Sequence, residues 1–163
     1  MNKNEKLKWN RILPFTSLDK IPDKVAGIYI WGFYRKKKFI PYYVGKAKNI
    51  KERLRDHMVN LCGGRYVIHK KECLDKFYEN KNKAKNNSGI LYDPQKPESE
   101  IKFIKERYRV FKVHIDEMVD NFHFKYAKVN LEGTTNEQNK HLRKLEKNVI
   151  SDIGIEKLWN KNR

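Results

Sequence analysis

Residues 26–44 read AGIYIWGFYRKKKFIPYYV, and this pattern sets the architecture expected for the rest of the chain. Ala26 to Phe33 and Phe39 to Val44 are rich in β-branched and aromatic residues, so each predicts a strand. The basic segment 34–38 between them is short enough to form the tip of a hairpin. Pro41 cannot donate a backbone hydrogen bond, which predicts an edge position or a bulge for the second strand.

A helix is expected directly after this hairpin, from Asn49 to about Leu61. Asn49 and Glu52 have the spacing of a capping box, with Asn in place of the more usual Ser or Thr. Apolar residues then recur at helical spacing and predict one buried stripe, formed by Ile50, Leu54, Met58 and Leu61.

Two further elements are expected late in the chain. Apolar and polar residues alternate over 122–126, as they do in a half-buried strand. Thr134 and Glu137 again have capping-box spacing, so a helix should begin near Thr134 and run to about Ile153.

The remaining segments have weaker patterns. Residues 1–24 form a basic lead-in with enough apolar side chains to lie on a core. Residues 70–78 and 101–118 are expected to be helical, and the polar stretch 79–99 is expected to be a loop.

Composition restricts the classes of protein that fit. A chain of 163 residues suggests one domain, 1–163, and the net charge of +17 predicts a polyanionic partner, with nucleic acid the first candidate. No apolar run approaches the roughly 20 residues that span a bilayer, and the first residues lack the apolar core of a signal peptide. We therefore expect no membrane association and a cytoplasmic location. A ribosomal protein, a repressor and a nuclease all fit this composition.

Two tyrosines of the hairpin are expected to lie close together. If Tyr29 pairs opposite Tyr43, the hairpin is symmetric about Lys36 and both phenols stand on one face of the sheet. On the following helix, Arg53 and His57 are four residues apart and therefore neighbours.

Lys46, in the connection to that helix, would complete a cleft holding two phenols, an amine, a guanidinium and an imidazole. Such a set can orient water, bind a phosphodiester and neutralise developing charge. The plainer interpretation is that the tyrosines are core residues and the cations a solvated face. The order and spacing of all five together favour the functional interpretation.

A single carboxylate stands out on the last predicted helix. Glu146 falls inside the apolar stripe formed by Leu142, Leu145, Val149, Ile150 and Ile153. A carboxylate on an apolar face is costly unless it is paired or binds a metal. Two interpretations stay open here, an ion pair with Arg53 or another cation, and a ligand for a divalent metal at the floor of the same cleft. A zinc site from Cys62, His69 and Cys73 is disfavoured, because no fourth ligand has suitable spacing.

These residues carry a resemblance to a known family. Gly27-Ile28-Tyr29 with Tyr43-Val44-Gly45, followed by Arg53, His57 and Glu146, resembles the GIY-YIG nuclease superfamily. Residues 43–55 are especially similar to the N-terminal nuclease domain of the bacterial excision-repair nuclease. The resemblance covers about residues 25–61 and 120–160.

The resemblance implies an α/β (α+β) fold with a small three-stranded antiparallel sheet flanked by helices, and hydrolysis of phosphodiester bonds. It implies one divalent cation per active site, Mg²⁺ or Mn²⁺, held by Glu146. Arg53 would bind the scissile phosphate, and Tyr29 or Tyr43 would orient or deprotonate the attacking water. A phenol has a pKa near 10, so a role as base requires a shift that Lys46 and the metal would supply. His57 occupies a position where restriction-type members often carry histidine, and Asn160 matches a supporting asparagine.

The chain departs from the compact family pattern in two places. The hairpin is extended by a basic tip, and residues 62–120 form a long basic insertion, which we expect to carry DNA recognition. The expected DNA contacts are Arg35, Lys36, Lys37, Lys38, Lys48, Lys81, Lys83 and Lys85. This architecture, with recognition elements inside the nuclease domain, resembles that of the type II restriction endonucleases of the superfamily.

The leading expectation is therefore a sequence-specific, metal-dependent endonuclease for double-stranded DNA. It would act as a homodimer and work with a cognate DNA methyltransferase in a restriction-modification system. The alternatives are a repair or phage DNA-degrading nuclease with relaxed specificity and, further away, a nucleic-acid-binding module without catalysis.

Overall fold

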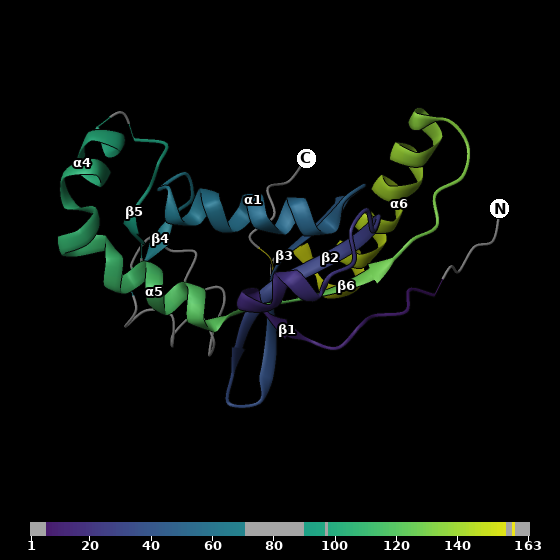
Figure 1. Ribbon diagram of the computed structural model, residues 1–163, viewed down its shortest axis with the longest axis horizontal. Helices are drawn as coiled ribbons and strands as arrows, with labels where there is room; N and C mark the ends of the chain where they lie inside the picture. The colour runs from purple at the N-terminus through teal and green to yellow at the C-terminus, as the bar shows by residue number, and fades with distance from the viewer. Residues whose placement is uncertain (1–5, 71–89, 97, 156–157, 159–163) are drawn as a thin grey trace.

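An antiparallel sheet of four strands lies at the centre of the protein, in the order β1-β6-β2-β3 (Figure 1). The computed structural model describes residues 6–70, 90–96, 98–155 and 158. The central hairpin is β2 (Gly27–Arg35) with β3 (Lys38–Ala47), and β6 (Phe122–Lys128) pairs with β2 on the other side. The mixed α and β class and all three predicted strands are confirmed.

The expected number of strands was too small by one. β1 (Leu13–Pro14) adds to the free side of β6, where Leu13 pairs with Phe124. A pairing of two residues offers no alternation to detect, so the lead-in gave no sign of it. A 3-10 helix, η1 (Phe15–Lys20), follows and inserts Phe15 into the core.

The register of the hairpin differs from the expected one. Tyr29 pairs with Gly45, and Tyr43 pairs with Trp31, so the two tyrosines are diagonal neighbours. Two features move the register: Lys36 and Lys37 form a two-residue turn, and β3 carries an extra residue where the pairing slips between Trp31 and Gly32. The bulge lies beside Pro41 on an edge strand, so both outcomes predicted from this proline occur.

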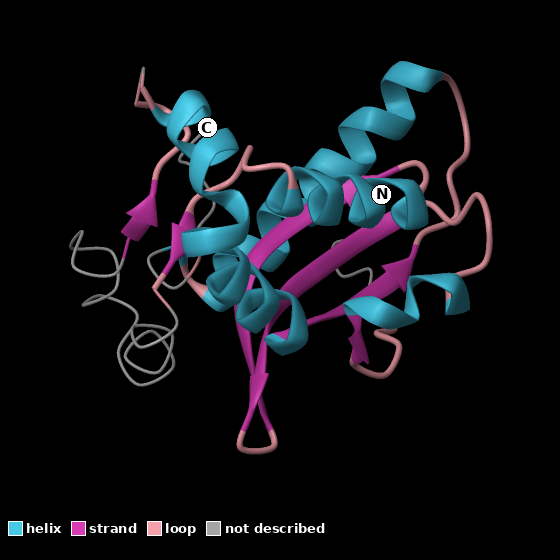
Figure 2. Ribbon diagram, turned by 60° about the vertical axis from the view of Figure 1, so that its left-hand side comes forward, coloured by secondary structure: helices cyan, strands magenta, loops and turns pink. Residues whose placement is uncertain are grey.

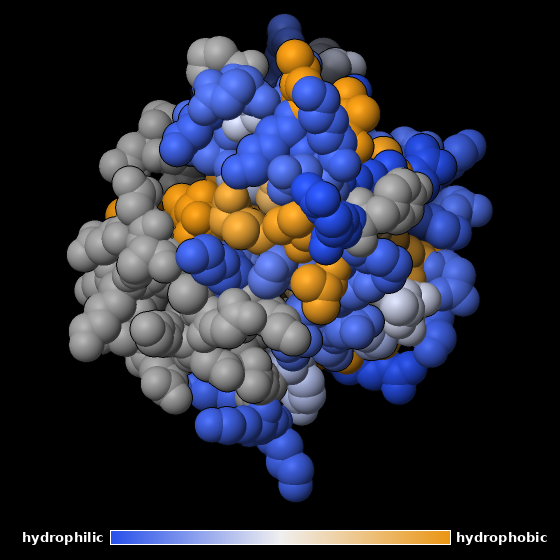
Figure 3. Space-filling view, turned by 90° about the vertical axis from the view of Figure 1, so that its left-hand side faces the viewer, coloured by the Kyte–Doolittle hydropathy of each residue, from blue (hydrophilic) through white to orange (hydrophobic). Residues whose placement is uncertain are grey.

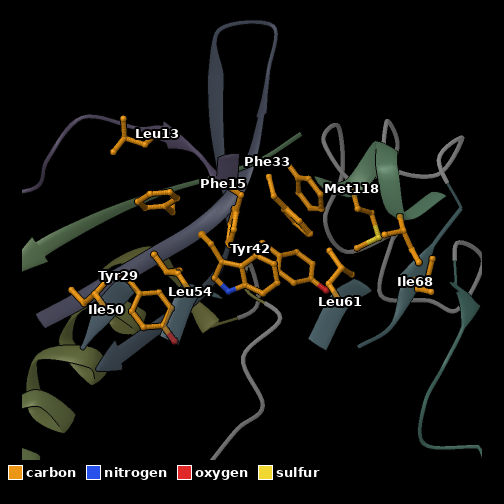
Figure 4. Close-up of a cluster of buried hydrophobic side chains, with 14 of the residues drawn as sticks. Leu13, Phe15, Tyr29, Phe33, Tyr42, Ile50, Leu54, Leu61, Ile68 and Met118 are labelled. Carbon is orange, nitrogen blue, oxygen red and sulfur yellow. The ribbon is translucent and has the colours of Figure 1, made fainter. Parts of the chain in front are cut away.

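Helices cover the two faces of the sheet (Figures 1 and 2). α1 (Ile50–Cys62) packs with Tyr29, Trp31 and Phe33 in one core, shown in Figure 4. α6 (Thr135–Ile153) packs with Ile28 and Ile30 in a second core. Because successive residues of a strand point to opposite faces, α1 and α6 lie on opposite sides of β2.

Both helices begin where their capping residues predict. The Asn49 side chain accepts a hydrogen bond from the Glu52 amide at 3.4 Å. Thr134 and Glu137 form a complete capping box at the start of α6. Ile50, Leu54 and Leu61 form the buried stripe of α1 as expected, with Met58 partly buried beside it.

Residues 62–120 contain more regular structure than expected. β4 (Ile68–His69) pairs with β5 (Ile90–Tyr92) in a second, two-stranded sheet. The predicted helical segment 101–118 is confirmed as α4 (Ser99–Glu106), a π-helical turn (Arg107–Phe111) and α5 (Lys112–Asn121).

The loop expected over 79–99 is wrong at its end, because β5 and the first residue of α4 fall inside it. A strand of three residues in a polar stretch is too short to show a period. Residues 71–89, with most of the helix expected at 70–78, lie outside the described residues.

Two surface properties complete the description. Within the described ranges, no helix has the length and apolar character needed to cross a bilayer. The end of the molecule formed by α4 and α5 shows a band of apolar side chains among polar ones (Figure 3), and Ile101, Ile104 and Val113 are exposed on these helices.

Candidate active site

A cleft of about 970 Å³ lies along the edge strand β3 and receives side chains from both faces of the sheet. The strand itself contributes Tyr42, Tyr43 and Lys46. Five of the six predicted catalytic residues line this one cleft: Tyr43, Lys46, Arg53, His57 and Glu146.

The side of the cleft toward α1 holds the phenol, the guanidinium and the imidazole. Tyr43 pairs with Trp31, whose side chain belongs to the core beneath α1. Arg53 and His57 come from α1 itself, where Arg53 is exposed and His57 is only 3% exposed. The rings of Tyr43 and His57 are 5.5 Å apart, and Trp31 stacks on His57 at 5.2 Å.

The side toward α6 holds the carboxylate and its ion pair. Lys46 pairs with Ile28, whose side chain lies in the core beneath α6. Its ammonium contacts the Glu146 carboxylate, and both side chains are largely withdrawn from solvent. Of the interpretations left open for Glu146, the ion pair is therefore present, with Lys46 as partner and not Arg53.

Tyr29 lies behind the cleft and does not line it. The prediction that Tyr29 and Tyr43 share one face is confirmed, with their rings 6.4 Å apart. Tyr29 is only 1% exposed, and Figure 4 shows it among Leu54 and Ile50. A Cβ at Gly45 would lie 2.3 Å from the Tyr29 hydroxyl oxygen, so glycine at this position makes room for the phenol.

A hydrogen-bonded chain connects Tyr29 to the cleft. The Tyr29 hydroxyl is 2.8 Å from Nε2 of His57, and Nδ1 of His57 is 2.6 Å from the hydroxyl of Tyr66. Tyr66 lines the cleft from the loop after α1. The imidazole is thus held on both nitrogens by phenols, one behind the cleft and one inside it.

Burial determines the protonation states of Tyr29 and His57. It raises the pKa of Tyr29 well above 10; Tyr43 adds to the rise, whereas the charge of nearby Arg53 opposes it. Burial, with the nearby charge of Arg53, lowers the pKa of His57 to about 3. At neutral pH, Tyr29 is therefore a neutral phenol and His57 a neutral imidazole.

The side chains of the cleft fit a divalent cation that takes its further ligands from the bound substrate. Within the described residues, no group of three or more His, Cys, Asp or Glu side chains is placed to hold a metal. Mg²⁺ is commonly bound through one or two carboxylates together with waters and substrate phosphates. Glu146, a carboxylate lining the cleft, is suited to such a site, and Lys46 balances its charge when the cation is absent.

Several residues that line the cleft were not predicted from the sequence. Arg143 and Lys147 line the cleft with Glu146. Arg143 lies three residues before Glu146 and four before Lys147, spacings of neighbours on a helix surface that were a usable signal. Arg65 and Tyr66 reach the cleft through the turn after α1, and no pattern in the sequence marks them.

The remaining predicted residues lie away from the cleft or outside the described part. Lys36, Lys37 and Lys38 are exposed at the tip of the hairpin, and Lys48 is exposed before α1. Asn160, Lys81, Lys83, Lys85 and the Arg35 side chain are not among the described residues. Of the disfavoured zinc ligands, Cys73 is also outside them, and His69 is buried against Tyr42.

Comparison of the chain with protein-family models, with curated proteins and with solved structures finds no match.

Proposed function

We propose that this protein is a metal-dependent endonuclease that hydrolyses phosphodiester bonds of double-stranded DNA, and that it is sequence-specific, as type II restriction enzymes are. The observation that carries the proposal is the meeting of Tyr43, Lys46, Arg53, His57 and Glu146 in one cleft. These residues come from β3, α1 and α6, and Lys46 and Glu146 are 100 positions apart in the chain. The same residues carry the resemblance to GIY-YIG nucleases.

The residues would divide the work between the two sides of the cleft. Arg53 is an exposed guanidinium on the cleft wall, suited to bind a phosphate and to stabilise the charge of the pentavalent transition state. Tyr43 lines the cleft whereas Tyr29 lies buried behind it, so Tyr43 is the better placed phenol to orient the attacking water.

On the opposite side, Glu146 would hold the divalent cation, Mg²⁺ or Mn²⁺. When bound, the cation supplies Lewis-acid polarisation of the phosphate and charge neutralisation at the leaving oxygen. Lys46 orients the carboxylate before the cation binds. Arg143 and Lys147 add positive charge beside the same carboxylate, which favours a polyanionic substrate.

The positive charge of the protein favours DNA as its substrate. The net charge of +17 and the exposed lysines of the hairpin tip favour a long polyanion over a small phosphate ester. Cutting both strands at a palindromic site calls for a second copy of the chain. Apolar side chains exposed on α4 and α5 are typical of a surface covered by another protein, which favours a homodimer. A cognate methyltransferase would protect the host sequence.

The test is digestion of supercoiled plasmid by the full chain with Mg²⁺, with Mn²⁺ and with chelator. Glu146→Gln removes one negative charge with little change in shape and should lower the cleavage rate on the order of a hundredfold or more. Asp152→Asn is the matched control, because Asp152 is an exposed carboxylate of the same helix that does not line the cleft. This control should cleave like the unmodified protein.

The products separate the proposed function from its rivals. Discrete fragments that need the metal support a sequence-specific enzyme. A smear, or cleavage that follows lesions and branched structures, would move the assignment to a repair or degradative nuclease. Salt-sensitive DNA binding with intact plasmid under both metals would leave a binding module and contradict the nuclease.

A further inference from the structure

Tyr66 ends a chain of hydrogen bonds whose direction is fixed at its other end. The network begins at Tyr29, whose phenol is only 1% exposed. Buried polar groups are rarely left unpaired, so the hydroxyl proton of Tyr29 must be donated to a nearby acceptor.

His57 supplies that partner. Nε2 of His57 lies 2.8 Å from the Tyr29 hydroxyl and is the acceptor available to it among the described residues. A neutral imidazole that accepts on Nε2 carries its proton on Nδ1. The neutrality follows from the burial of His57 and from the charge of Arg53 close by, which together hold its pKa near 3.

The direction of the last contact follows. Nδ1–H of His57 donates to the Tyr66 oxygen at 2.6 Å, so the hydroxyl proton of Tyr66 is left to point elsewhere. Among the described residues, the structure records no acceptor for this proton, and Tyr66 lines the same cleft as Glu146. The hydrogen bonds therefore run one way, from Tyr29 through His57 to Tyr66 and into the cleft.

We propose that Tyr66 is a substrate-contacting residue that donates its hydroxyl proton as a hydrogen bond to a non-bridging oxygen of the scissile phosphodiester. Tyr29 and His57 are then positioning residues, which fix the rotation of the Tyr66 hydroxyl before substrate arrives. A donor whose direction is set in advance stabilises developing charge without reorganising during the reaction. This inference rests on the proposed function, and it gives the buried Tyr29 a role that does not require it to reach water.

The first arm of the test compares two tyrosine variants in plasmid cleavage. Tyr66→Phe should lower kcat by about a hundredfold to a thousandfold, as loss of one preorganised donor does, and change KM by less than about twofold. Tyr92→Phe is the matched control, because the Tyr92 hydroxyl donates to the Gly64 carbonyl of the same loop without lining the cleft. If the control loses as much kcat as Tyr66→Phe, the effect belongs to the loop and the proposal is overturned.

The second arm uses NMR to determine the direction of these hydrogen bonds, and it does not depend on cleavage activity. In ¹⁵N-histidine NMR of the full protein, the signals that disappear in His57→Gln identify His57, which should be the neutral tautomer protonated on Nδ1. Tyr66→Phe should speed exchange of that Nδ1 proton with water, while Tyr92→Phe leaves it unchanged. A proton on Nε2 would reverse the chain and overturn the proposal, whether or not the protein cuts DNA.

The two arms keep the failures apart. An unmodified protein that leaves plasmid intact contradicts the proposed function and removes the substrate contact with it, while NMR still decides the direction of the chain. An active protein in which Tyr66→Phe cleaves normally contradicts the donor role alone.

Discussion

Two histidines, His57 and His69, are each only 3% exposed, and burial keeps both uncharged. Their pKa values are lowered to about 3 and about 4, below the 6.5 expected in the unfolded chain. The unfolded state therefore binds more protons whenever the pH falls below about 6.5. By linkage, the stability that these histidines contribute is complete above that pH and is lost as the pH falls toward 4 and 3.

We expect the free energy of unfolding, measured in urea, to be flat between pH 7 and 8 and to decline below about pH 6.5. His57→Gln should reduce this decline, because glutamine pairs with both phenols but does not titrate. His141→Gln, at an exposed position, should leave the decline unchanged. A decline of equal size in both variants would mean that His57 does not control the acid sensitivity.

Individual residues of the site were predictable where a pattern carried them. Tyr43, Arg53, His57 and Glu146 stand at spacings that a motif and two helical stripes make visible in the sequence. Tyr66 was not predictable, because its position depends on the turn that ends α1 at Gly63 and Gly64. That turn brings a loop residue back to a helix residue nine positions earlier, and nothing local in the sequence marks this contact.

Among the elements, the hairpin turn is under conformational strain. Lys36 and Lys37 have φ values of 49° and 61°, in the left-handed region that Asn and Gly occupy more easily. Each ordinary residue in that region costs roughly 1–2 kcal/mol. In return for this cost, the turn carries two lysines, whereas an Asn-Gly turn would carry none.

Replacing the pair by Asn-Gly should therefore raise the free energy of unfolding by about 1 kcal/mol or more, measured in urea. The same variant should bind duplex DNA more weakly if the lysines contact phosphates. The single variants Lys36→Asn and Lys37→Gly test whether the gain comes from relief at both positions. An Asn-Gly variant no more stable than the original chain would show that the turn is not strained.

Helices with clear capping residues were predictable from the sequence, whereas strand pairings that depend on distant segments of the chain were not. α1 and α6 begin at capping residues and carry clear apolar stripes, so their bounds agree closely with the expected ones. The hairpin was expected, but its register depends on a Lys-Lys turn and a bulge beside Pro41 that no residue type announces. β1 and β5 are two and three residues long and depend on partners elsewhere in the chain.

At the scale of the whole molecule, the charge of +17 should make DNA binding strongly dependent on salt. Each lysine that contacts a phosphate adds about 0.9 to the slope of log K against log salt. Replacing Lys36, Lys37 and Lys38 with serine should thus lower the slope by nearly three. Serine at Lys6, Lys8 and Lys20, which are also exposed, removes the same charge from the lead-in and should leave the slope nearly unchanged.

Fluorescence anisotropy of a labelled duplex between 50 and 300 mM salt, on the order of the physiological range, would measure both slopes. Equal slopes for the two triple variants would mean that the hairpin tip contacts no more phosphates than the lead-in does. Six residues of extended strand separate Lys37 from Tyr43, about 20 Å, so the tip would reach roughly six base pairs from the cleft.

The pairing of Lys46 with Glu146 also has a consequence for synthesis on the ribosome. The two residues are 100 positions apart, which a ribosome covers in about 5–20 s. For most of that interval the growing chain carries Tyr43, Arg53 and His57 but has no Glu146. The nascent protein would pass this period without its proposed metal ligand, and so would be harmless to nucleic acids around it until α6 closes the second face of the sheet.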